Sequence, residues 1–138
     1  HMVGGRFDRA RIELRRVYRD GRLPVHRMMA LQFLGNVYDS ATDYTRANEC
    51  YEEVLGSGML EVEPRFMTAL LNLAMNCTTV GLAAKGVQYF SDLVSRFPAS
   101  VTQLRSTLVQ KPEFSAALAR QSELHETLRR KVPALFAA

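Results

Sequence analysis

The chain of 138 residues contains no tryptophan, two cysteines and only three lysines among its 18 basic residues. Cys50 and Cys77 do not form a CxxC pair, so the sequence lacks a disulfide framework and a zinc signature, and we expect a reducing, cytoplasmic environment. No apolar run approaches 18 residues, so membrane insertion is not expected. An arginine bias is weak support for nucleic-acid binding, and we predict none. The length predicts one globular domain.

Strand-like alternation of apolar and polar residues is also absent. Apolar residues instead recur three or four positions apart, which predicts an all-α fold of about seven helices in antiparallel pairs. Turn-forming residues interrupt this pattern at 20–24, 39–43, 56–58, 79–81 and Pro98. A short helix is predicted at about 101–109, and a last helix from Pro112 to about Lys131.

The helical pattern repeats after 39 residues, and the size of the side chain is kept at most of the repeated positions. Small residues in the middle of a helix let a neighbouring helix approach closely, and large residues one turn away fill the space beside them. We therefore interpret these positions as a packing signature. It consists of Leu34, Gly35, Tyr38, Ala47 and Tyr51 in the first copy, Leu73, Ala74, Gly86 and Phe90 in the second copy, and the terminal Pro98.

The order Leu34-Gly35-x2-Tyr38, followed by Ala47-x3-Tyr51, resembles the tetratricopeptide repeat (TPR) pattern, with Leu31 in place of the usual tryptophan. The resemblance covers about residues 6–100. It implies an α-solenoid of antiparallel helix pairs with a C-terminal capping helix. Residues 3–100 would hold the repeats, as a partial unit at 6–22 and whole units at about 28–60 and 67–99. Residues 101–138 would hold the capping helices, and residues 1–2 are interpreted as an expression scar.

TPR proteins bind other proteins, as extended or helical peptides, in a concave groove formed by the first helix of each pair. The resemblance therefore implies a non-catalytic protein-interaction module. Its predicted groove residues are Met29, Gln32, Asn36 and Asp39 in the first whole unit, and Thr68, Leu71, Asn72, Met75 and Thr79 in the second. Asn36 and Asn72 match two asparagines of the family's carboxylate clamp, but Gln32 stands at the clamp's lysine position, so capture of a chaperone C-terminus is not expected.

Two alternative functions remain open. The chain is a structural segment that stacks on further repeats or on another subunit, or it is a small chaperone similar to the TPR chaperones of bacterial secretion systems. Residues 6–27 carry eight arginines against three acidic residues. The stripe Arg11-Arg15-Arg19 faces either water or an acidic partner, and self-association through this N-terminal helix is a further option.

Catalytic patterns are missing. His26 and His125 have no neighbours at metal-ligand spacing, and neither cysteine has a histidine at a spacing that predicts a nucleophile pair. The Gly56-Ser57-Gly58 stretch follows a predicted helix and does not lead into one, unlike a phosphate-binding loop. We therefore predict no enzymatic activity, no metal site and no cofactor.

Overall fold

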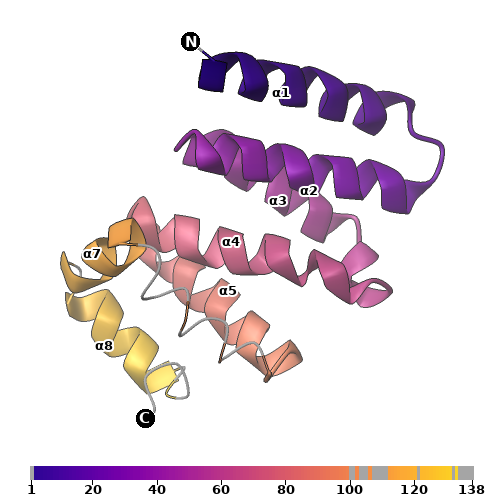
Figure 1. Cartoon of the computed structure of the whole chain (residues 1–138). Coiled ribbons are helices and arrows are strands. Elements are labelled where there is room, and N and C mark those ends of the chain that lie inside the picture. Colours follow the sequence, from indigo (N-terminus) through magenta and orange to yellow (C-terminus); the bar gives the residue numbers. More distant parts are fainter. Residues whose placement is uncertain are drawn as a thin grey trace. The chain divides into compact units, whose positions relative to one another are not determined.

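The computed structural model describes residues 2–99, 102, 106, 112–120, 122–131 and 133. Every regular element within these ranges is a helix, so the all-α prediction is confirmed for this part of the chain (Figure 1). The chain forms two compact units, His1–Ala69 and Leu70–Ala138, where its length predicts one domain.

The first unit contains three α-helices and two short 3-10 helices. Helix α1 packs against α2, and α2 packs against α3. Helix α1 begins before the predicted boundary at residue 6 and includes Gly4 and Gly5. In chain order the elements are α1 (Met2–Asp20), α2 (Pro24–Ser40), α3 (Tyr44–Gly56), η1 (Met59–Glu61) and η2 (Pro64–Phe66).

Helix α4 (Met67–Thr79) begins at the end of the first unit and continues into the second. The second unit also contains α5 (Ala83–Arg96), α7 (Pro112–Arg120) and α8 (Ser122–Lys131). The sequence predicts one continuous helix from Pro112 to Lys131, whereas the structure has two. The predicted helix at 101–109 lies outside the described residues, except for Thr102 and Ser106, which are helical.

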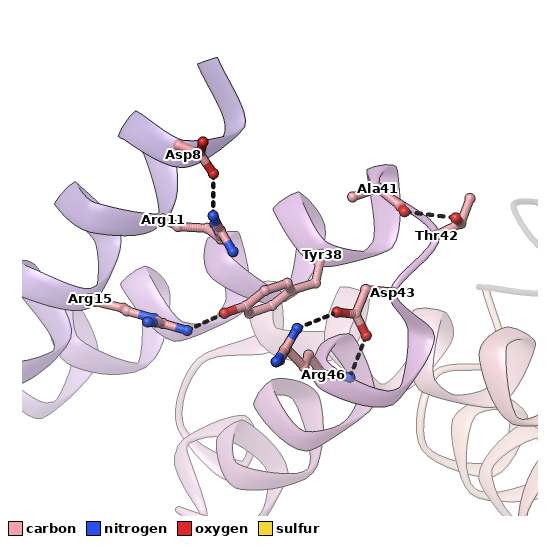
Figure 2. Close-up of polar contacts among 8 residues, drawn as sticks. All are labelled: Asp8, Arg11, Arg15, Tyr38, Ala41, Thr42, Asp43 and Arg46. Atoms are coloured by element: carbon pink, nitrogen blue, oxygen red, sulfur yellow. Dashed lines mark hydrogen bonds and ion pairs between the residues drawn. The ribbon is translucent and has the colours of Figure 1, made fainter. Parts of the chain in front are cut away.

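Local sequence explains where the helices of the first unit begin. Pro24 occupies the first turn of α2, where its missing N–H group has no helical partner to lose, and Leu23 before it is extended. Asp43 caps α3 by accepting a hydrogen bond from the backbone N–H of Arg46 at 3.2 Å. The Arg46 guanidinium also lies 3.0 Å from Asp43, which fastens the same turn (Figure 2).

Each unit has its own core. In the first unit, Ala47, Tyr51 and Val54 of α3 are fully buried, as is Phe66. In the second unit, Leu73 and Ala74 of α4 and Phe90 and Leu93 of α5 are fully buried. Helix α7 joins this second core through Phe114, whose ring centroid lies 5.8 Å from that of Phe90.

The two helix–helix turns, between α2 and α3 and between α4 and α5, have the same backbone hydrogen bonds at positions 39 residues apart. Both turns place one residue in the left-handed region, Thr42 with φ 59° and Gly81 with φ 87°. In the α2–α3 turn, the N–H groups of Ala41, Thr42, Asp43 and Ala47 donate to the carbonyl oxygens of Val37, Asp39, Tyr38 and Asp43, in that order. In the α4–α5 turn, the N–H groups of Val80, Gly81, Leu82 and Gly86 donate to those of Asn76, Thr78, Cys77 and Leu82. The sequence shift therefore also relates the backbones of the two turns.

Candidate interaction site

The first half of the predicted groove lies on α2. Met29, Asn36 and Asp39 are half-buried, whereas Gln32 is 8% exposed. The prediction that Gln32 is exposed to a partner is therefore wrong. Gln32 lies one turn from Gly35, which packs against the ring of Tyr51, so Gln32 borders the side of α2 that α3 covers.

The polar groups of Asn36 and Asp39 face the interior of the first unit. The fully buried Tyr51 donates its hydroxyl proton to Asn36 Oδ1 at 2.7 Å, and Asp39 Oδ2 lies 3.2 Å from the same hydroxyl. A buried hydroxyl needs such an acceptor, since an unpaired one costs about 1–3 kcal/mol. Asn36 and Asp39 therefore stabilise the α2–α3 pair, a role that the sequence pattern did not predict.

Two buried side-chain oxygens of the first unit have no hydrogen-bond partner among the residues that the structure describes. They are Oε1 of Gln32 and Oδ1 of Asn48. The shift of 39 residues places Leu71 and Val87 at the equivalent positions of the second pair, and both of these apolar side chains are buried. The first pair thus carries polar groups at sites that the second pair fills with hydrocarbon.

The second half of the predicted groove lies on α4. Thr68, Asn72 and Thr79 are half-buried, and the Thr79 hydroxyl donates to the carbonyl of Met75 in its own helix at 2.9 Å. Leu71 and Met75 are 4% and 2% exposed, so the prediction that they face a partner is wrong. Both belong to the apolar side of α4 that also carries Leu70 and Ala74. Of these residues, Thr68 belongs to the first unit, and Leu71, Asn72, Met75 and Thr79 belong to the second.

The glycines of the packing signature lie at close contacts between helices. A Cβ atom added to Gly35 would lie 2.6 Å from Tyr51 Cε1, and one added to Gly86 would lie 2.7 Å from Thr78 Oγ1. Both distances are too short for nonbonded atoms, so only glycine fits without rearrangement. Of the other signature residues, Pro98 is exposed, and the following are buried: Leu34, Tyr38, Ala47, Tyr51, Leu73, Ala74 and Phe90.

Helix α1 is attached to the α2–α3 pair by polar side chains. Arg15 donates to the hydroxyl of Tyr38 on α2, and Tyr18 donates to the carboxylate of Glu53 on α3, a bond that raises the pKa of Tyr18 (Figure 2 shows the first contact). Arg11 pairs with Asp8. Arg19 pairs with Asp20. The predicted stripe Arg11-Arg15-Arg19 is therefore not a free surface, because all three members are engaged within the first unit.

The chemistry available to the described residues is limited. Burial, with smaller contributions from the carboxylates of Glu53 and Glu49, raises the pKa of the Cys50 thiol to about 11, so the thiol is protonated near neutral pH. No three His, Cys, Asp or Glu side chains within the described ranges are grouped as a metal ion would require. Among the same residues, no helix is both long enough and apolar enough to cross a membrane.

Comparisons with protein-family models, curated proteins and solved structures find no significant match to this chain. The resemblance to TPR proteins therefore stays a prediction from the repeat, and the assignment of function depends on the geometry described above.

Proposed function

We propose that this protein is a non-catalytic interaction module with TPR-like repeats, and that it binds a segment of another protein along the first helix of each repeat. The observation that supports this proposal most directly is the hydrogen-bond pattern shared by the two turns, with the 39-residue spacing that the repeat predicts. Repeated helix pairs of this kind present the same face of each first helix to a partner.

The partner surface that we propose is narrower than the one predicted from sequence. In the first unit it consists of the half-buried residues Met29 on α2 and Thr68 on α4. In the second unit a separate surface consists of the half-buried residues Asn72 and Thr79 on α4. A flexible thioether adapts to different apolar side chains, and an amide offers both a donor and an acceptor to a peptide backbone. This chemistry fits an extended or helical peptide better than a charged small molecule.

Binding variants in the first unit test the proposal. A partner isolated with the wild-type protein is titrated calorimetrically against Met29→Arg and Thr68→Arg, which add bulk and charge to the proposed surface. We expect each variant to weaken binding at least tenfold. Thr45→Arg is the matched control, because Thr45 is exposed on α3, the second helix of the pair, and this variant should bind as the wild type does.

Thermal melts of the three variants separate a loss of binding from a loss of folding. A partner that binds Met29→Arg and Thr68→Arg as tightly as the wild type would place the binding surface elsewhere. Loss of binding in Thr45→Arg alone would assign recognition to α3.

A structural segment of a larger assembly is the second candidate. Val17 on α1 and Phe33 on α2 are large apolar side chains of the first unit that are 43% and 48% exposed. An additional helix stacked on them, from another subunit, would cover both. Replacing Val17 and Phe33 by serine should then abolish co-purification with that subunit while leaving the binding of a peptide to α2 unchanged.

A further inference from the structure

One face of α1 carries an exposed apolar side chain surrounded by arginines. Arg9, Ile12, Arg16 and Arg19 follow one another at intervals of three, four and three residues, so they share one side of the helix. All four are exposed, and Ile12 is 66% exposed. We call these four residues the α1 outer face.

The acidic residues nearest to this face leave it with an excess of positive charge. Asp8 is paired with Arg11 and Asp20 with Arg19. The exposed Glu13 lies one turn from Arg9 and Arg16 and offsets part of their charge. Arg9 and Arg16 form no ion pair with the described residues. Their guanidinium groups are therefore available to carboxylates from outside the molecule, and guanidinium binds carboxylate with two parallel hydrogen bonds.

We propose that the α1 outer face docks an acidic amphipathic helix of a partner protein. An apolar stripe on that helix covers Ile12, and glutamates or aspartates beside the stripe reach Arg9 and Arg16. This surface is separate from the proposed peptide-binding residues of α2 and α4, and it does not depend on them.

Charge and exposure favour this occupant over the alternatives. Two copies of α1 would place arginine against arginine, because a symmetric pair brings the same face of each copy together. A nucleic-acid backbone would pair with the arginines but would leave Ile12 in water. An acidic amphipathic helix satisfies both the charge and the apolar centre of the face.

The test uses a fluorescently labelled synthetic peptide with glutamates on both sides of a leucine stripe at helical spacing, titrated with the full chain by anisotropy. We expect Arg16→Glu to weaken binding at least tenfold and Ile12→Ser at least fivefold. Arg22→Glu is the matched control, since Arg22 is exposed and lies outside α1, and it should stay within twofold of the wild type. The four residues project from the surface, so all variants should melt as the wild type does.

Several outcomes would overturn the proposal. A scrambled peptide of the same composition that binds equally well would show attraction by charge alone. Duplex DNA or phosphatidylserine vesicles that bind more tightly than the peptide, with loss in Arg16→Glu, would replace the partner helix with another polyanion. Concentration-dependent self-association that Arg16→Glu abolishes would identify the occupant as a second copy.

Discussion

The α2–α3 pair and the α4–α5 pair have the same turn but fill their interiors differently. In the first pair Gly35 on the first helix makes room for the ring of Tyr51, whereas in the second pair Gly86 on the second helix makes room for Thr78. The residue that allows close approach has moved to the opposite helix. Alanine occupies the equivalent position in the other pair: Ala74 corresponds to Gly35, and Ala47 corresponds to Gly86. Both pairs therefore keep a small residue on each helix, but the helix that carries the glycine differs.

The two pairs also differ in the polar groups inside them. Tyr51 has its hydroxyl bonded to Asn36 and near Asp39, and the equivalent residues of the second pair are Phe90, Met75 and Thr78. The hydroxyl of Tyr51 and its amide acceptor are replaced together by Phe90 and Met75, whereas Thr78 keeps an oxygen at the position of Asp39 and uses it within α4. The comparison indicates that a single exchange between the two pairs would leave an unmatched polar group.

The largest effect is expected from filling the glycine contact in the first pair. Gly35→Leu places new atoms against a fully buried ring and should lower the free energy of unfolding by about 3 kcal/mol. Chemical denaturation measures this loss. Gly56→Leu is the control, because a Cβ atom added to Gly56 would meet no described atom of another helix within 4 Å. Equal stability of the two variants would contradict the close packing of α2 against α3.

Moving the hydroxyl into the second pair should have the next largest effect. Phe90→Tyr buries a hydroxyl beside Phe114 with no amide at position 75, and it should cost about 2 kcal/mol in the free energy of unfolding. Adding Met75→Asn supplies the acceptor found in the first pair and should restore part of the loss. A double variant less stable than the sum of the two single variants would show that the pairs are not equivalent.

Exchange of the left-handed turn residue should have a smaller effect. Gly81→Thr forces a β-branched residue to φ near 87° and should destabilise the protein by about 1–2 kcal/mol. The reverse change, Thr42→Gly, relieves strain in the first turn but adds flexibility to the unfolded chain, so it should be close to neutral. Thermal melts measure both, and a neutral Gly81→Thr would contradict a conformational cost of the left-handed backbone at position 81.

The smallest effect, a gain, is expected from removing an unpaired oxygen. Gln32→Leu gives the first pair the residue that the second pair has at position 71, and it should raise the free energy of unfolding by about 1 kcal/mol. Gln88→Leu serves as the control, since Gln88 is exposed on α5 and should gain nothing. Loss of stability in Gln32→Leu would show that the buried oxygen is hydrogen-bonded in solution.

Some of these features were predictable from sequence and others were not. The turn residues and the small residues at 35 and 86 act through local geometry and spacing along the chain. The spacing of the apolar residues and the turn residues therefore predicted the all-α class and the positions of the turns between helices. The partners of Tyr51 and the burial of Gln32 depend on the rotation of α2 relative to α3, which spacing along one helix does not define. The division between α7 and α8 has no proline or glycine signal near position 121.

The link between α1 and α2 also limits how these two helices are arranged. Only Gly21, Arg22 and Leu23 separate the two helices, and three extended residues span about 10 Å. Pro24 disfavours fusion of α1 and α2 into one continuous rod, because a proline inside a helix removes a hydrogen bond and clashes with the preceding turn. The two helices therefore stay separate and pack against each other through this short link.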